Sequence, residues 1–319
     1  MRSRGRGALW VAARKVRPSS RACLTGSCSR RATSGDMIEV STKSGCRMTS
    51  YSIADLDNRL TPSELMPVMF VGHGNPMHAI SDNDYTRTWT RLGQQLPVAQ
   101  TIVVVSAHWL TPGATHITDA PKNPIIYDFG GFPDELSRVR YDSVGDTDVA
   151  RLLARQLVEY EAELDKQWGL DHGTWSILKF LAPAPEVPVL QISIDYSMPL
   201  PKLYELYGRL RAMRRRGVIF IGSGNIVHAL GRAKWHGGGA WDWAQQFDAD
   251  TAAALQERQV GKLLDPYGTW AEARIAVPTD DHYRPMVAAL SLLEDNEQIS
   301  FFNDSIDMGS IGMRSFVTV

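Results

Sequence analysis

Short runs of consecutive apolar residues recur along the chain from about residue 66, each bounded by glycine, proline or polar turn residues. These runs are too short for helices, and they are apolar at successive rather than alternate positions. Both properties favour buried strands of a sheet that is covered on its two faces. The predicted strands lie at residues 68–71, 101–106, 187–195 and 218–221. Residues 301–302 and 316–319 are expected to close the sheet as antiparallel strands at an edge.

Between these runs, apolar residues recur at intervals of three and four, which is the spacing of an amphipathic helix. Such stretches predict helices over residues 81–96, 146–164, 200–216, 241–264 and 280–293. Strands that alternate with helices, with no internal repeat or linker after residue 60, indicate one α/β domain over residues 60–319. Its central sheet should be mostly parallel but mixed, with helices on its flanks.

The predicted helix over residues 200–216 ends in a cluster of arginines, Arg211, Arg214, Arg215 and Arg216. The cluster could indicate a phosphate or nucleic-acid site. We interpret it instead as a solvated face that complements the negative end of the helix dipole.

The first 50 residues differ in composition from the rest of the chain. They hold eleven Lys/Arg and two Asp/Glu, and they show no sustained apolar period. We expect a disordered basic leader, which is either an organelle transit peptide or sequence upstream of the true start, with Met37 and Met48 as alternative initiators. The expected location is cytoplasmic, or organellar if the leader is a transit peptide.

Charge and hydropathy exclude two classes of partner. The remaining residues hold 23 basic and 33 acidic groups, so the body is acidic and nucleic acid is not an expected partner. No apolar stretch approaches the roughly 20 residues that a membrane-spanning helix needs. The sequence does not indicate an oligomeric state.

Cysteine placement restricts the chemistry of the body. All three cysteines, Cys23, Cys28 and Cys46, lie in the leader, whereas all eight histidines lie in the body. Disulfides and thiolate metal ligands are therefore excluded from the body, and imidazole is the available ligand for a borderline metal.

Several histidines share one placement, because each follows a predicted strand or opens a predicted helix. They are His73, His108, His228 and His282. Open α/β sheets bind ligands at the carboxyl ends of their strands, so these side chains should meet there. Three neutral imidazoles with open coordination positions describe a catalytic metal site. His78, His116 and His236 lack this placement.

A further histidine, His172, lies in a turn followed directly by Gly173, just before an amphipathic run at 177–181. Near a helix start, its ring can face a pocket while Asp171 or a backbone carbonyl fixes the tautomer. Alternatively, it merely caps the helix. The long loop at 111–145 contains the stretch Tyr127 to Pro133, whose aromatics either wall a pocket for a flat substrate or anchor the loop as a hydrophobic plug.

Six motifs in order carry a resemblance to a known family: GHGNPM, VVVSAHW, YDFGGFP, WGLDHGTW, GSGNIVHAL and HYRPM. From Met66 to the C-terminus, the sequence resembles the extradiol aromatic-ring-opening dioxygenases of the 4,5-DOPA dioxygenase type, in the class III ring-cleaving superfamily. The resemblance implies a single α/β domain that holds a non-haem metal. It also implies that O2 is inserted into a DOPA-like catechol beside its hydroxyls, with ring opening.

Site roles follow from the resemblance position by position. His73, His108 and His282 match the family's metal ligands. His228 matches a histidine at the metal that is either a further ligand or an acid/base group, and His172 matches a histidine that faces the substrate. The expected catalytic residues are therefore His172 and His228. The expected metal is Fe(2+) for the reaction, with Zn(2+) bound as isolated, since Zn²⁺ outranks Fe²⁺ in affinity for such ligands.

Two positions depart from the family pattern. Asn75 stands where members commonly have Ser, and Asp280-Asp281-His282 stands where they have Pro-Glu-His. Neither change removes an imidazole, so the departures concern substrate preference. One ligand is a glutamate elsewhere in the superfamily, so an all-imidazole site is expected to be more positive and to favour an anionic catecholate.

A zinc-dependent hydrolase or esterase is the alternative function. In that reading metal-bound water attacks a carbonyl, and His172, Asp171 or Asp281 serves as the general base. Metal identity separates the two functions, because the dioxygenase needs Fe²⁺ and oxygen whereas the hydrolase works with zinc under anaerobic conditions.

Overall fold

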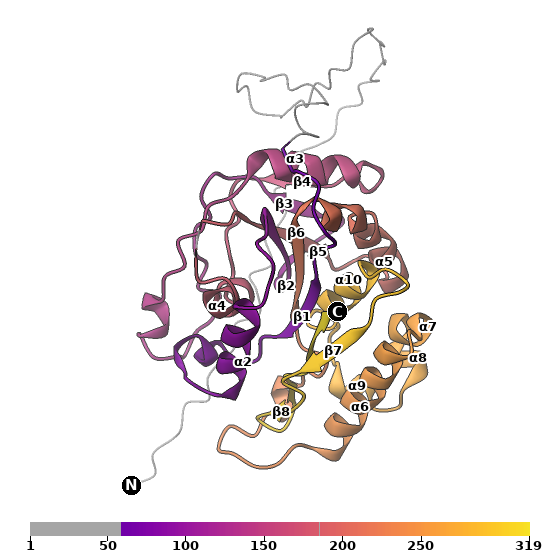
Figure 1. The fold of residues 1–319 in the computed structure, drawn as a ribbon. Coiled ribbons are helices and arrows are strands. Elements are labelled where there is room, and N and C mark those ends of the chain that lie inside the picture. The colour runs from indigo at the N-terminus through magenta and orange to yellow at the C-terminus, as the bar shows by residue number, and fades with distance from the viewer. Residues whose placement is uncertain (1–58, 185) are drawn as a thin grey trace, which may run out of the picture.

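The computed structural model describes residues 59–184 and 186–319 (Figure 1), so the predicted leader at residues 1–50 lies outside the described residues. An eight-stranded sheet has the order β4-β3-β5-β2-β6-β1-β10-β7. Its strands are β1 (Val68–Gly72), β2 (Thr101–Thr111), β3 (His116–Thr118), β4 (Glu163–Asp165), β5 (Val189–Asp195), β6 (Val218–Gly224), β7 (Ile299–Phe302) and β10 (Ser315–Thr318). A second, two-stranded sheet pairs β8 (Ile306–Asp307) with β9 (Ile311–Gly312).

The central strands β5, β2, β6 and β1 are parallel neighbours. On one side, β10 pairs antiparallel with β1 and β7 pairs antiparallel with β10, so the closing strands lie at an edge as predicted. On the other side, β3 pairs antiparallel with β5 and parallel with β4. The prediction of a single α/β domain with a mostly parallel, mixed sheet is confirmed.

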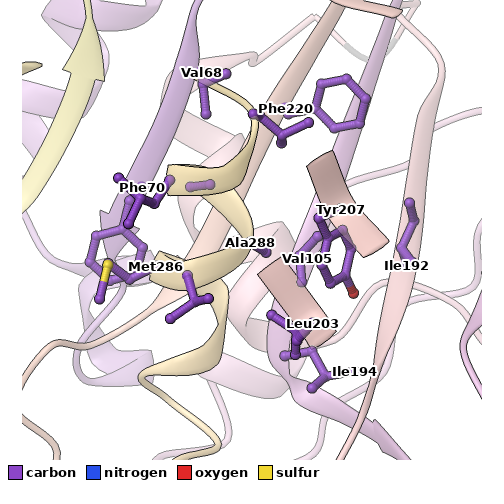
Figure 2. Close-up of a cluster of buried hydrophobic side chains, with 14 of the residues drawn as sticks. Val68, Phe70, Val105, Ile192, Ile194, Leu203, Tyr207, Phe220, Met286 and Ala288 are labelled. Atoms are coloured by element: carbon purple, nitrogen blue, oxygen red, sulfur yellow. The ribbon is translucent and has the colours of Figure 1, made fainter. Parts of the chain in front are cut away.

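The strands are apolar at successive positions because each face of the sheet packs under a separate layer of helices. Val68 and Phe70 of β1 belong to one buried cluster, whereas Met69 and Val71 belong to the other. Alternate side chains of a strand point to opposite faces, so both faces need apolar residues. Figure 2 shows the first cluster, where Tyr207 and neighbouring helical residues lie against the strands.

The helices of the first layer include α5 (Leu200–Gly208) and α10 (Arg284–Ser291), and those of the second include α2 (Asp84–Gly93) and α4 (His172–Leu181). The remaining described helices are α3 (Thr147–Gln156), α6 (Asp242–Gln256), α7 (Val260–Leu264), α8 (Pro266–Thr269) and α9 (Ala273–Ala276). The 3-10 turns are η1 (Pro76–Ile80), η2 (Leu136–Arg138), η3 (Val158–Tyr160), η4 (Arg211–Arg216) and η5 (Leu230–Arg232). None of the helices in the described ranges is long and apolar enough to cross a bilayer.

Two predicted helices are shorter in the structure. The helix expected over 146–164 ends at Gln156, and the chain turns through Glu161, whose φ of 52° is left-handed, into β4. The helix expected over 200–216 ends at Gly208 and continues as η4. Glycine is a poor helix former, which accounts for the break there.

The interpretation of the arginine cluster as a solvated face is wrong for Arg214. Its side chain is fully buried and forms an ion pair with Glu297, in which Nη1 lies 2.6 Å from a carboxylate oxygen. The guanidinium also donates to the carbonyl oxygens of Met66 and Leu292, each at 2.8 Å. Arg214 therefore ties η4 to two other segments of the chain.

Candidate metal centre

Two of the predicted site histidines follow parallel neighbouring strands. His73 comes directly after Gly72, the last residue of β1, and His228 comes four residues after Gly224, the last residue of β6. The His73 backbone N–H donates to the Gly224 carbonyl at 3.1 Å. The carboxyl ends of these strands lie at one edge of the sheet, so the strand-end pattern predicted their neighbourhood correctly.

An irregularity within a strand, rather than a strand end, places His108 at the site. The sequence predicted that the strand ends at Ser106, but β2 continues to Thr111, so His108 lies inside the strand. Pairing with β5 shifts between Val105, which faces Ile192, and Leu110, which faces Ile194. Such an irregularity leaves residues unpaired, bends the strand and re-aims side chains. The shift allows a residue within the strand to reach the site.

His282 depends on close backbone approach to β6. A Cβ on Gly224 would lie 2.2 Å from the His282 carbonyl oxygen, and a Cβ on Gly222 would lie 2.2 Å from the Pro285 carbonyl oxygen. The Asn225 backbone N–H donates to the same His282 carbonyl at 2.9 Å. The segment before α10 can therefore lie directly on β6 because these two residues have no side chain.

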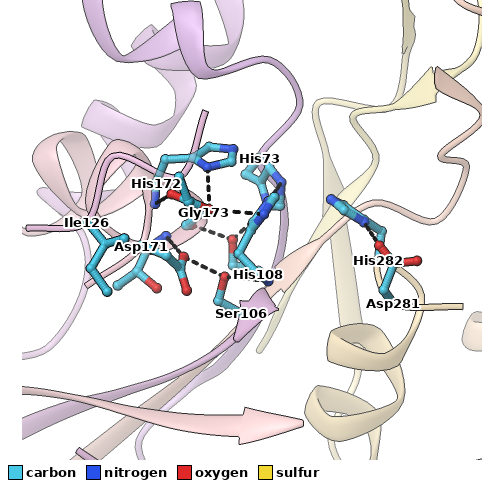
Figure 3. A network of polar contacts seen from close by, with 12 residues as sticks. His73, Ser106, His108, Ile126, Asp171, His172, Gly173, Asp281 and His282 are labelled. Atoms are coloured by element: carbon cyan, nitrogen blue, oxygen red, sulfur yellow. Dashed lines mark hydrogen bonds and ion pairs between the residues drawn. The ribbon is translucent and has the colours of Figure 1, made fainter. Parts of the chain in front are cut away.

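The five histidine rings gather in one region. The ring centroids of His73, His108 and His282 lie 5.0–5.3 Å from one another. His228 stacks on His282 at 3.4 Å, and His172 lies 4.0 Å from His108. Figure 3 shows the His282 ring pointing across toward His73 and His108, with His172 on their far side.

Two groups of side chains bring potential ligand atoms within 4.8 Å of one another. One group is His73, His108 and His172, and the other is His228, Asp281 and His282. Neither group, among the residues that the structure describes, contains His78, His116 or His236.

Hydrogen bonds fix which ring nitrogen faces the centre. The Ser223 hydroxyl donates to the Gly173 carbonyl at 2.5 Å, so its oxygen is left to accept from His73 Nδ1 at 2.9 Å. The Nδ1 atoms of His108 and His282 lie 3.2 and 2.5 Å from the carboxylates of Asp128 and Asp281, respectively. A carboxylate only accepts, so the hydrogen bond of His282 places the proton on Nδ1 and leaves Nε2 bare, and the ion-pair contact of His108 favours the same tautomer.

This arrangement fits a metal ion. His73 Nε2 and His108 Nε2 lie 3.1 Å apart. In the tautomers that Ser223 and Asp128 favour, neither atom carries a proton, so their lone pairs repel unless a cation lies close to both. Two imidazole nitrogens that each bind one ion at about 2.0–2.1 Å are themselves separated by roughly 3 Å. Imidazoles bind both zinc and iron, so the donor set fits either metal.

Burial keeps the rings of His73, His108 and His228 neutral. Removal from water, together with the neighbouring histidines, lowers the pKa of His73, His108 and His228 well below the ordinary value. Metal ligands must be deprotonated, so this state is the one that binding requires.

His172 is the first residue of α4 and is almost fully buried. Burial alone would lower its pKa, but the Asp128 carboxylate, 3.0 Å from Nδ1, raises it. The expectation that Asp171 fixes the His172 tautomer is wrong. Asp171 caps α4 through the Thr174 backbone N–H and also accepts from Ser106 Oγ and Gln191 Nε2, each at 2.7 Å.

The comparisons with known proteins agree with this geometry. Residues 66–313 match the family described as the catalytic LigB subunit of aromatic ring-opening dioxygenase. The chain belongs to this family.

Relatives of known name extend the match. The chain is 39% identical to a 4,5-DOPA dioxygenase extradiol of Escherichia coli K12, over 79% of this chain and 94% of that protein. It is 29% identical to a protein of the same name from Beta vulgaris, over 77% and 94% of the two chains. A solved structure of an uncharacterized protein from Escherichia coli K12 superposes with a TM-score of 0.69 at 35% identity, covering 79% and 99%. The resemblance found in the motifs is confirmed.

Sequence reasoning missed two residues of this LigB-family site, Asp128 and Ser223. Asp128 lies within the YDFGGFP motif, in which only the aromatic residues suggested a role in the site. Ser223 lies between the glycines that close β6. Asp281, expected only as a general base, contacts His282 Nδ1 and orients that ring.

The aromatic loop at 127–133 is anchored in the way that the plug interpretation predicted. The Tyr127 hydroxyl donates to the Val139 carbonyl at 2.6 Å, and the Trp175 indole N–H donates to the Ile126 carbonyl at 3.0 Å. Phe129 meets the His172 ring edge to face at 5.7 Å. The loop therefore brings one aromatic ring against a site histidine, where a substrate wall would be needed.

Proposed function

We propose that this LigB-family chain is a metal-dependent extradiol dioxygenase that inserts O2 into a DOPA-like catechol and opens its ring. The observation that carries the proposal is the pair of bare Nε2 atoms of His73 and His108, 3.1 Å apart among further imidazoles at the carboxyl edge of the sheet. Residues 60–319 would form the catalytic unit.

In this proposal, His73, His108 and His282 hold the metal. His228, stacked on His282, acts as a fourth ligand or as an acid/base group. When bound, the metal lowers the pKa of the catechol hydroxyls and brings catechol and oxygen into one coordination sphere, which makes their reaction effectively intramolecular. Fe²⁺ serves the reaction, and Zn²⁺ is expected in the protein as isolated because imidazoles bind it more tightly.

Proton transfer is assigned to His172 and His228. A base must take a proton from the catechol and later return one, and histidine is suited because its pKa lies near neutrality. The Nδ1 atom of His172 faces Asp128, so Nε2 is the atom that exchanges a proton with the substrate. Burial lowers the pKa of His228 and keeps its ring neutral, whereas Asp128 raises the pKa of His172, so His172 holds a proton more readily.

The substrate assignment draws on the names of the relatives and on the aromatic loop. The Escherichia coli and Beta vulgaris proteins are both named 4,5-DOPA dioxygenase extradiol. Phe129, beside His172, would provide an apolar wall for a flat ring. The proposed partners are a small-molecule catechol and O2, and the cytoplasmic location stays a prediction from the sequence.

Two of the three candidate bases of the hydrolase alternative are engaged elsewhere, which leaves His172 as its general base. Asp281 is engaged with His282 Nδ1, and Asp171 is engaged with Ser106, Gln191 and the start of α4. Neither carboxylate is free to activate a water molecule.

Anaerobic reconstitution with Fe²⁺, followed by a panel of catechols that includes DOPA, tests the proposal. We expect oxygen uptake stoichiometric with loss of catechol for the Fe²⁺ protein, and none for a sample loaded with Zn²⁺. Ester hydrolysis by the Zn²⁺ sample without oxygen, together with no attack on any catechol by the Fe²⁺ sample, would replace the dioxygenase with the hydrolase.

A further inference from the structure

We propose that Asp128 is a positioning residue whose single carboxylate orients both a metal ligand, His108, and the proton-transferring histidine, His172. The roles of these two histidines rest on the proposed function. The role of Asp128 goes beyond it, because this carboxylate would couple metal binding to proton transfer.

The contacts of Asp128 carry the inference. One carboxylate oxygen, Oδ2, lies 3.2 Å from His108 Nδ1 and 3.0 Å from His172 Nδ1. The other oxygen, Oδ1, accepts the backbone N–H of His172 at 2.9 Å. The side chains of Asp128 and His108 are 11% and 12% exposed, and that of His172 is 1% exposed, so water competes weakly for these contacts.

The chemistry of the carboxylate makes the two rings act together. An ionised carboxylate has no proton to donate, so it favours in both rings the tautomer that carries the proton on Nδ1 and leaves Nε2 facing away from Asp128. The ring centroids lie 4.0 Å apart, so the two rings border the same space. One acceptor thus fixes the tautomer and orientation of both imidazoles.

The ion-pair partners of Asp128 differ from those of an ordinary structural carboxylate. Within the described residues, the ion pairs of Asp128 are with these two imidazoles and include no arginine or lysine. The anchors of its loop, at Ile126 and Tyr127, hold the backbone directly before Asp128. The carboxylate is therefore held rigidly and acts on the site alone.

The variant Asp128→Asn keeps the side-chain shape while removing the charge and one acceptor oxygen. We expect metal affinity, measured by competition with a chromogenic chelator, to fall about 10–100-fold, because outer partners of metal-bound histidines have effects of this size. At saturating Fe²⁺, kcat should also fall about 10–100-fold, because His172 loses its orientation.

A double-mutant cycle separates positioning from general damage. In a His172→Ala background, Asp128→Asn should still weaken metal binding by the same factor but should cause no further loss of kcat at saturating metal. If kcat falls by the same factor in both backgrounds, or if Asp128→Asn binds metal and turns over like the parent, the proposal is overturned.

Asp134→Asn is the matched control, because Asp134 is an exposed residue of the same loop. It should leave metal affinity, kcat and the melting temperature unchanged. If the parent protein opens no catechol, the proposed function fails. The affinity comparison still decides whether Asp128 orients His108.

A second measurement needs no variant. The ¹⁵N imidazole shifts of the Zn²⁺-loaded protein report which nitrogen of each ring carries the proton. We expect Nδ1 to be protonated in both His108 and His172. A proton on Nε2 of either ring would contradict the shared role of Asp128.

Discussion

The three proposed ligands have unlike partners behind their rings. A neutral hydroxyl holds His73, whereas carboxylates hold His108 and His282. A carboxylate behind an imidazole makes the ligand more basic, so His108 and His282 should bind the metal more strongly than His73.

Replacing any one of His73, His108 or His282 with alanine should remove most of the bound metal, because a three-ligand site has no spare ligand. Metal content after dialysis, determined by elemental analysis, is the measurement. Full stoichiometric metal in any of these single variants would remove that residue from the ligand set.

His172→Ala should keep its metal and lose about 10²–10⁴-fold in turnover, the usual contribution of a general acid or base. Metal analysis and catechol turnover on the same sample test this. A fully active variant would show that the assignment of His172 is wrong.

His228→Ala distinguishes its two proposed roles. Loss of metal affinity would identify a ligand. Retained metal, with lower turnover and an altered pH profile, would identify a base. We favour a dual role, because the ring stacks on His282.

The site histidines could be predicted from the sequence because each lies in a short local motif, and all but His108, which lies inside β2, stand beside a strand or helix end. Asp128 could not be found in this way, because its two partners lie 20 and 44 residues away and approach it only through the folded loop. Asp171, the neighbour of His172 in sequence, was the wrong choice because it points to Ser106 and Gln191.

Among the elements, β6 requires residues without a side chain at two positions, because its glycines let the His282 segment lie on the strand. Gly224→Ala places a methyl group 2.2 Å from a backbone carbonyl, which cannot move as a flexible side chain can. We expect about 1–3 kcal/mol of destabilisation, the usual cost of overpacking, together with weaker metal binding through displacement of His282.

Gly261→Ala is the control for this substitution, because nothing lies within 4 Å of its added methyl group. Denaturant unfolding and metal competition on both variants decide the matter. Equal behaviour of the two variants would contradict the role assigned to Gly224.

The pairing of η4 with Glu297 predicts a dependence of stability on pH. Burial would raise the pKa of Glu297, but the hydrogen bonds and the charge of Arg214 outweigh burial, so the pKa lies below its ordinary value. This carboxylate therefore stabilises the fold above its unfolded-state pKa, and the contribution is lost as pH falls through the lower folded-state pKa.

Glu297→Gln should cost about 3 kcal/mol at neutral pH, because it leaves Arg214 buried without its counter-charge. The difference from the parent should shrink in acid, as the pH falls below the ordinary pKa of a glutamate. Unfolding by urea across this range measures both effects. Glu159→Gln, which breaks the exposed pair with Arg209, should leave stability almost unchanged.

Burial of Arg214 could not be predicted, because helical spacing does not reveal that the helix ends at Gly208 and that η4 turns inward. The strands β3 and β4 were missed for a related reason. Each has three residues, which is too short for a recognisable apolar pattern.

For the whole molecule, the apolar runs predicted the buried central strands because burial on both faces requires apolar residues throughout. The order of the strands depends on contacts between distant segments, which periodicity does not record. The buried apolar residues within the described ranges extend from Leu60 to Phe316.

A chain that begins at Met48 should therefore melt at the same temperature as the full chain, since the leader composition cannot supply a core. Thermal unfolding of both chains provides the test. A large loss of stability in the shorter chain would mean that the leader contributes to the fold.

The two carboxylates that contact the site imidazoles affect the order in which metal and catechol bind. An all-imidazole ligand set was expected to make the site more positive, but the structure places the carboxylates of Asp128 and Asp281 against the rings of His108 and His282. Before metal binds, these charges repel an anionic catecholate and attract any dication. The cation must therefore enter first, so calorimetric titration with a catechol should give heat only after metal has been added.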